Sequence, residues 1–160
     1  MKRILVILLG AALLFNLVGC TAEKEEPEPA YYSFSWNGVR IVMGAEAAPV
    51  LEALGEPKSH TEEPSCAFDG MDETYYYGSF YLSTCTLDGR EYIYTLWFAD
   101  DSVETEEHIR IGSSQSQVEA AYGEDCFSGT NSLVLTRGES RLIVLLEDGL
   151  VSSVRYEAVL

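Results

Sequence analysis

The chain has 160 residues and carries 26 acidic against 10 basic side chains, a net charge of −16 at pH 7. This charge argues against nucleic-acid binding, which requires a basic surface towards the phosphates. Beyond an apolar N-terminal leader, about 140 residues remain, enough for one domain or two small similar lobes around a hydrophobic core.

The leader has the pattern of a bacterial lipoprotein signal. Lys2 and Arg3 precede an apolar run over residues 4–15, which is shorter than the roughly 20 residues of a membrane-spanning helix. The run leads to the sequence LVGC, which ends at Cys20 and resembles a lipobox. The resemblance implies that residues 1–19 are removed and that acylated Cys20 anchors the protein on the extracytoplasmic face of the cell membrane. The alternative is an ordinary secretory signal with a chance cysteine.

Residues 20–30 are predicted to form the acylated end and a tether. The sequence TAEKEEPEPA after Cys20 has four glutamates, two prolines and no apolar period, which is typical of a solvated segment. After cleavage, 8 basic and 26 acidic side chains remain, a net charge of −18. This charge is expected to keep the folded body away from an anionic lipid surface.

Two segments of the body, residues 41–57 and 109–125, match at an offset of 68 residues and indicate an internal repeat. In the first, apolar residues at positions 47, 50, 51 and 54 predict one face of a helix that ends at Gly55. In the second, Ser114 and Gln117 have the spacing of a capping box, and Gly123 ends the helix.

Antiparallel strands are predicted after each helix. Asp88-Gly89 separates apolar runs over residues 80–86 and 91–98, and Asp148-Gly149 separates runs over 141–147 and 150–158, which are hairpin signals. A third strand is expected near residues 74–77 and 133–137. The predicted fold is therefore α+β, with two tandem repeats, each a helical segment followed by an antiparallel β-meander, and helices on one face of the sheet. The lobes would cover residues 31–99 and 100–160.

Two resemblances accompany this prediction. The pattern Gly-x5-Val-x3-apolar-Gly over residues 44–55 and 112–123 is similar to that of β-lactamase-inhibitor-like proteins and of small envelope-assembly lipoproteins. The sequences SCAFDG from residue 65, YYYGSF from residue 75 and DDSV from residue 100 resemble a group of uncharacterised lipoproteins from Gram-positive gut anaerobes. The resemblances imply a lipoprotein of this fold, and they supply no active site.

Aromatic residues between positions 75 and 98 form the candidate binding surface. On a strand over residues 91–98, Tyr94 is expected on one face with Phe98, and Trp97 on the other. Only one face can lie against the helices, so the other would present aromatic contacts to a partner. The alternative is that both faces are packed. The candidate binding residues are Tyr75, Tyr77, Tyr81, Tyr92, Tyr94 and Trp97.

The remaining reactive side chains match no catalytic pattern. Cys66, Cys85 and Cys126 remain after Cys20, so they cannot all pair within one molecule. Cys66 and Cys85 are the candidate disulfide, because an extracytoplasmic compartment permits one, and a buried thiol is the alternative. The acidic turn over residues 69–73 lacks the full calcium-loop pattern. We therefore expect no catalytic residue, no metal and no cofactor.

The sequence thus predicts a membrane-anchored extracytoplasmic lipoprotein that acts as a non-catalytic protein-binding module. Its partner would be another envelope or extracellular protein, and the acidic body would favour a basic one. Two alternatives stay open, a structural lipoprotein of an envelope complex and a small-ligand lipoprotein that binds glycans or calcium.

Overall fold

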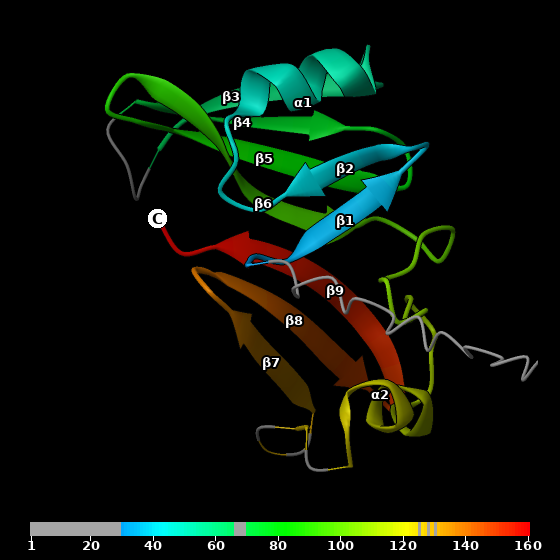
Figure 1. Ribbon diagram of the computed structural model, residues 1–160. Coiled ribbons are helices and arrows are strands. Elements are labelled where there is room, and N and C mark those ends of the chain that lie inside the picture. The colour runs from blue at the N-terminus through cyan, green and yellow to red at the C-terminus, as the bar shows by residue number, and fades with distance from the viewer. Residues whose placement is uncertain (1–29, 66–69, 125, 128, 130) are drawn as a thin grey trace, which may run out of the picture.

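The computed structural model describes residues 30–65, 70–124, 126–127, 129 and 131–160. The leader, Cys20 and most of the tether lie outside the described residues. The described part contains nine strands and two short helices (Figure 1). In chain order they are β1 Ser33–Trp36, β2 Val39–Val42, α1 Ala47–Leu54, β3 Ser59–Pro64, β4 Met71–Tyr76, β5 Phe80–Leu87, β6 Arg90–Phe98, α2 Gln115–Tyr122, β7 Ser132–Arg137, β8 Ser140–Glu147 and β9 Leu150–Ala158.

Seven strands form one antiparallel sheet in the order β3-β4-β5-β6-β9-β8-β7. The strands β3 to β6 are a meander, β7 to β9 are a second meander, and β6 pairs with β9 to join them. The strands β1 and β2 form a separate hairpin. Figure 1 shows this hairpin crossing in front of β5 and β6, with α1 above it and α2 beside the lower end of β9.

The predicted α+β fold of two tandem helix-plus-meander repeats is wrong, because the molecule is mostly β and its sheet is continuous. Each helix has eight residues and fully buries a single side chain, Ala47 in α1 and Val118 in α2. Helices this small cannot cover a meander alone. Instead, β6 and β9 pair across the predicted lobe boundary at residue 99, which removes two sheet edges.

Individual elements follow the predictions more closely. The helix α1 ends at Gly55, whose φ of 74° is positive and whose N–H donates to the Leu51 carbonyl. The helix α2 begins with the predicted capping box, in which Ser114 Oγ accepts from the Gln117 N–H at 3.3 Å. Both Asp-Gly pairs form the turns of hairpins, β5 with β6 and β8 with β9.

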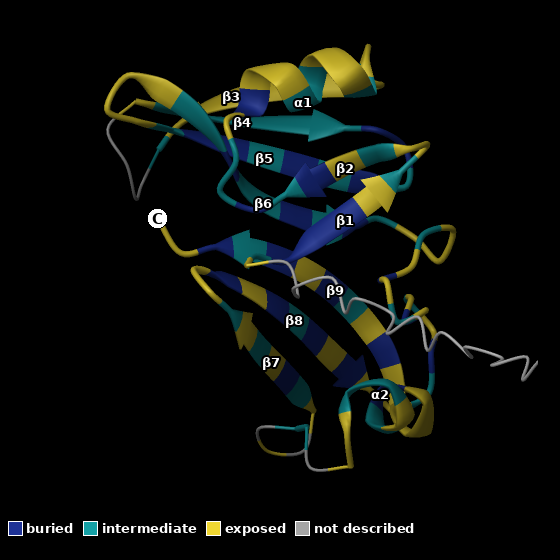
Figure 2. Ribbon diagram, viewed as in Figure 1, coloured by how far each residue is buried: buried dark blue, intermediate teal, exposed yellow. Residues whose placement is uncertain are grey.

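The hydrophobic core lies between the sheet and the β1–β2 hairpin. The Phe34 ring of β1 has its centroid 5.2 Å from that of Phe80 in β5 and 5.4 Å from that of Phe98 in β6. We call this side of the sheet the covered face and the opposite side the open face. Figure 2 shows buried and exposed positions alternating along β8, as expected when one face is covered. In the described part of the chain, neither helix is long and apolar enough to cross a membrane.

Candidate functional site

A β-bulge determines which residues of β6 reach the open face. Thr95 pairs with Ser83 and Ile93 pairs with Thr84, so β6 has one extra residue, Tyr94. The bulge shifts the alternation of side chains by one position. The prediction that Tyr94 shares a face with the core residues at positions 96 and 98 is therefore wrong, and Tyr94 lies beside Thr95 in a hollow of the open face.

Three aromatic rings, which we call the aromatic row, cross the open face. Tyr76 of β4 stacks on Tyr81 of β5 with ring centroids 4.6 Å apart, and Tyr81 stacks on Trp97 of β6 at 5.0 Å. These distances are close to the spacing of neighbouring strands, so the rings stand face to face with their edges directed away from the sheet. Arg155 of β9 is the cross-strand partner of Trp97.

A hollow of about 320 Å³ opens at the Trp97 end of the aromatic row. Four strands contribute its lining, which combines aromatic rings, hydroxyl groups, one carboxylate and one guanidinium. The lining residues are Asp72, Ser83, Tyr94, Thr95, Trp97, Ser153 and Arg155. The volume is at the lower end of the range for small-molecule sites.

Two charged groups in the hollow have hydrogen-bonding capacity to offer a ligand. Asp72 Oδ1 is buried, and no described residue donates a hydrogen bond to it. Arg155 Nη2 lies 4.0 Å from Glu157 Oε2, the outer limit of an ion pair, and its side chain is half exposed. A buried carboxylate oxygen without a donor is unfavourable, so a ligand that supplies one would be stabilised there.

The predicted binding residues fall into two groups. Tyr81, Tyr94 and Trp97 lie in the aromatic row or the hollow. Tyr77 is buried against Phe80 on the covered side, with ring centroids 5.2 Å apart. The structure adds three residues that the prediction missed, namely Tyr76, Asp72 and Arg155.

The other two predicted tyrosines make contacts away from the aromatic row. Tyr92 lies beneath Arg90, whose guanidinium carbon is 5.8 Å from the ring centroid. Tyr75 belongs to a polar network on the covered face, in which its hydroxyl donates to Glu73 Oε2 at 2.6 Å. His60 Nε2 lies 2.8 Å from the same oxygen, and the imidazole stacks on the Tyr75 ring at 4.5 Å.

Electrostatics keep the Tyr75 hydroxyl protonated. Burial raises its pKa well above the ordinary value, and the neighbouring carboxylates of Glu73 and Glu91 raise it further. The hydroxyl therefore acts as a donor that holds the Glu73 carboxylate in place. Tyr75 and His60 thus fix the geometry of one end of the sheet, on the side away from the hollow.

The predictions about the disulfide and the metal ligands depend in part on residues outside the described ranges. Cys66 and Asp69 lie outside them, so the disulfide and the acidic-turn ligands stay untested. Cys85 is buried and forms no disulfide with another described residue. Burial, followed by the negative charges of Asp72 and Glu91, raises the pKa of Cys85 to about 11. No group of three or more His, Cys, Asp or Glu side chains within the described ranges is arranged to hold a metal ion.

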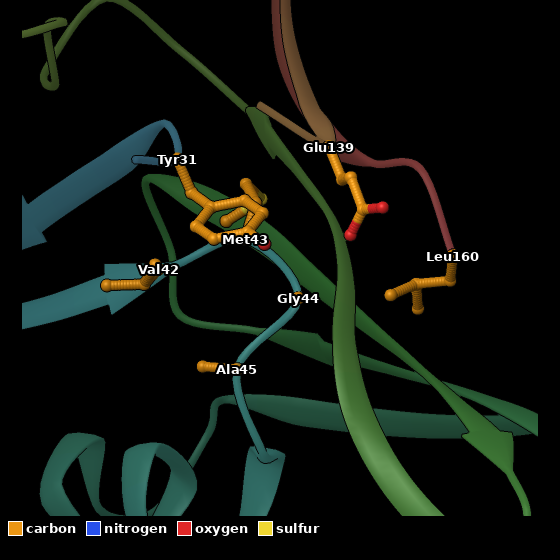
Figure 3. Close-up of a pocket in the computed structure, with 7 residues that line it drawn as sticks. All are labelled: Tyr31, Val42, Met43, Gly44, Ala45, Glu139 and Leu160. Carbon is orange, nitrogen blue, oxygen red and sulfur yellow. The ribbon is translucent and has the colours of Figure 1, made fainter. Parts of the chain in front are cut away.

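A second pocket, of about 230 Å³, lies where the chain enters the folded body (Figure 3). Its walls are largely apolar side chains and backbone, and Figure 3 shows the Tyr31 ring and the Glu139 carboxylate on different sides of it. The carbonyl of Ala30 lies against Gly138, where an added Cβ would come within 2.2 Å of the oxygen. This pocket lies beside the first described residues of the chain, and the hollow is the better candidate for a ligand.

No family model matches the chain, and no curated protein matches it. Among solved structures, it is similar to an extracellular protein containing a SCP domain from Bacillus anthracis, with 16% identity, a TM-score of 0.45, and coverage of 78% of this chain and 47% of that one. It is also similar to a cysteine-rich secretory protein from Staphylococcus aureus, with 10% identity, a TM-score of 0.48, and coverage of 72% and 44%. The chain thus spans less than half the length of either protein.

These findings correct the predicted family resemblance. The similar solved structures are an SCP-domain protein and a cysteine-rich secretory protein, so the expected likeness to β-lactamase-inhibitor-like proteins and to uncharacterised lipoproteins of Gram-positive gut anaerobes is wrong. Both neighbours are extracellular or secretory by name.

Proposed function

We propose that the chain is a lipid-anchored extracytoplasmic binding module without a catalytic role, which binds through the open face of its sheet. The hollow beside Trp97 carries this proposal. There an aromatic wall adjoins Asp72 and Arg155, two charged groups with hydrogen-bonding capacity that a ligand would use. Small-molecule sites combine an apolar wall with a few polar groups in this way.

The N-terminal sequence supports the location. Acyl chains on Cys20 would hold the protein on the outer face of the cell membrane, and more than one chain gives stable attachment. The acidic tether would then separate the folded body from the lipid headgroups. In this arrangement the open face is presented to other components of the envelope or to molecules outside the cell.

A second candidate function is contact with another protein, as expected from the sequence, either as a binding module or as a structural part of an envelope complex. Val134 of β7 and Leu145 of β8 are 44% and 42% exposed, and Ile143 lies opposite Val134 in the strand pairing. These apolar side chains extend the open face away from the hollow. A contiguous apolar patch of this kind favours a protein partner over a small ligand.

The anchor is tested by changing Cys20→Ser, which we predict to move the protein from the membrane fraction to the soluble extracytoplasmic fraction. A serine cannot take the thioether-linked lipid, so the apolar contribution of the acyl chains is lost. Immunoblots of fractionated cells measure the change, and Cys126→Ser serves as the control that stays with the membrane. Retention of the Cys20→Ser variant in membranes would contradict the anchor.

The binding surface is tested by photocrosslinking in intact cells. A photoreactive benzoylphenylalanine replaces Tyr81 in the aromatic row, or Glu52, which is exposed on α1, as the matched control. We expect a crosslinked product from position 81 and none from position 52, detected as a shift in gel mobility. Equal yields from both positions, or no product from position 81, would show that the open face does not contact a macromolecular partner.

A further inference from the structure

We propose that the hollow binds an oligosaccharide, with one sugar ring packed on Trp97 and hydroxyl groups of the same ligand hydrogen-bonded by Asp72 and Arg155. This inference rests on the proposed binding role of the open face, and it names the ligand class. Its basis is the combination of the Trp97 indole with polar groups of opposite charge in the lining of a single hollow.

The aromatic wall favours a ring-shaped ligand. Tyr81 covers one face of the Trp97 indole, with ring planes only 11° apart. The hollow is lined by Trp97 and not by Tyr81, and Thr95 and Arg155 lie beside the indole in the same lining. An aromatic face carries partial negative charge and attracts the partly positive C–H groups of a sugar ring. Because Tyr81 supports the indole from behind, little side-chain freedom is lost when a ligand binds.

The polar groups of the hollow require a ligand that both donates and accepts hydrogen bonds. Asp72 Oδ1 needs a donor, because it is buried and receives no hydrogen bond from the described residues. The Arg155 guanidinium has only donors to offer, and its contact with Glu157 is 4.0 Å long. A hydroxyl group donates and accepts, so a polyhydroxylated ligand that reaches both side chains can satisfy both.

The spacing of the charged groups favours a neutral ligand with more than one ring. Asp72 on β4 lies in the row of Cys85, whereas Arg155 on β9 lies in the row of Tyr81, four residues further along β5. Three strand spacings across the sheet and four residues along it separate their backbones by roughly 19 Å. A purely anionic ligand would be repelled by the Asp72 carboxylate, and a purely cationic one would be repelled by the Arg155 guanidinium. An uncharged oligosaccharide avoids both repulsions.

A peptide is the competing ligand class, since its backbone also donates and accepts hydrogen bonds. Extended peptides commonly bind by adding a strand to an exposed sheet edge. The hollow lies on the face of β4, β5, β6 and β9, and no residue of the edge strands β3 and β7 lines it. The position of the hollow therefore favours the carbohydrate.

The test uses the full-length, lipidated protein in detergent micelles. Its binding is first measured on an array of neutral hexose and N-acetylhexosamine oligosaccharides. Each oligosaccharide that binds is then titrated while tryptophan fluorescence is recorded. We expect saturable binding to at least one oligosaccharide and a change in emission. Trp97→Ala should weaken this binding at least about tenfold, as loss of a central aromatic contact does. Asp72→Asn, which keeps the shape of the side chain, should weaken it by a smaller factor.

Two further variants keep the result interpretable. Arg155→Ala removes a half-exposed side chain, so it tests the site even if Trp97→Ala fails to fold, and it should also weaken binding. Val134→Ala, on the open face outside the hollow, is the matched control and should leave binding unchanged. Thermal unfolding of each variant verifies its fold.

The inference is overturned if no oligosaccharide of the array binds saturably, or if Arg155→Ala and Asp72→Asn bind as tightly as the unchanged protein. Binding of a tripeptide library that depends on Trp97, without carbohydrate binding, would assign the hollow to peptides instead. A crosslinked product at position 81 in cells, together with a negative array, would leave the proposed binding role standing and remove only the carbohydrate.

Discussion

Cys85 shows how burial decides the chemistry of a single residue. Its side chain is fully buried in β5, and its neighbour across the strand pair is the acidic Asp72. Burial, followed by the charges of Asp72 and Glu91, raises the pKa of the thiol from 9.0 to about 11. The reactive form of cysteine is the thiolate, so the folded protein holds Cys85 in its unreactive state at neutral pH.

We predict that iodoacetamide at pH 8 leaves Cys85 unmodified in the folded protein and modifies it after unfolding in urea. The folded pKa of about 11 keeps the group protonated at this pH, and burial excludes the reagent. Peptide mapping by mass spectrometry measures the modification at each cysteine.

Two other outcomes of this experiment are informative. Rapid modification of Cys85 in the folded protein would contradict its burial. A Cys85 that stays unmodified in urea until a reductant is added would be disulfide-bonded, and a linked peptide containing Cys66 would then establish the bridge expected from the sequence.

The free energy of unfolding should also depend on pH through this thiol. An unfolded cysteine ionises near pH 9, whereas the folded one ionises near pH 11. The contribution of Cys85 is therefore fully present below pH 9 and is lost as the pH rises towards 11, because only the unfolded state releases its proton in that window.

At the scale of elements, the sequence predicted strands best where turn residues and alternation agree. The strand β9 spans the predicted residues 150–158, because Asp148 and Gly149 both adopt positive φ, as the hairpin turn requires. The same signal exists at Asn37-Gly38, where φ is 48° and 81°, and it marks the β1–β2 hairpin that was not predicted. The all-exposed edge strand β3 has no alternation to detect.

The candidate site was less predictable, since it depends on register between strands far apart in sequence. The abundance of tyrosine near residues 75–94 identifies an aromatic surface, but only the bulge at Tyr94 decides the face of that residue. Arg155 reaches the hollow because β9 pairs with β6, and no local pattern reveals that pairing. The prediction of two separate lobes left no place for the pairing of β6 with β9.

The two helices differ in how their first turns are stabilised. Ser114 caps α2 through its side chain, whereas Glu46 at the start of α1 makes no such hydrogen bond. We predict that Ser114→Ala lowers the free energy of unfolding by about 1 kcal/mol, because the Gln117 N–H loses the Ser114 hydroxyl as an acceptor and keeps only the Ser114 carbonyl. Urea unfolding followed by circular dichroism measures the change.

Glu46→Ala is the matched control for the cap. It removes only an exposed ion pair with Arg90, which is worth less than about 1 kcal/mol. A Ser114→Ala variant no less stable than Glu46→Ala would show that the capping box contributes little to α2.

At the scale of the whole molecule, pairing of β6 with β9 makes the two meanders interdependent. The core crosses the same junction, because the Phe34 ring lies 5.4 Å from Phe98 of β6 and 6.3 Å from Tyr156 of β9. A chain ending at residue 99 would lose Tyr156 and leave the edge of β6 unpaired. The β1–β2 hairpin would then cover only part of a core.

We therefore predict that the full chain unfolds in one cooperative transition and that a chain truncated after residue 99 does not fold. The truncated chain would have an unpaired strand edge and exposed core side chains. The apolar surface that it still buries would then not offset the conformational entropy lost on folding. Calorimetry of the full chain should give equal calorimetric and van't Hoff enthalpies. A cooperative melt of the truncated chain would instead establish two independent lobes, in which case the hollow between β4 and β9 would depend on how those lobes associate.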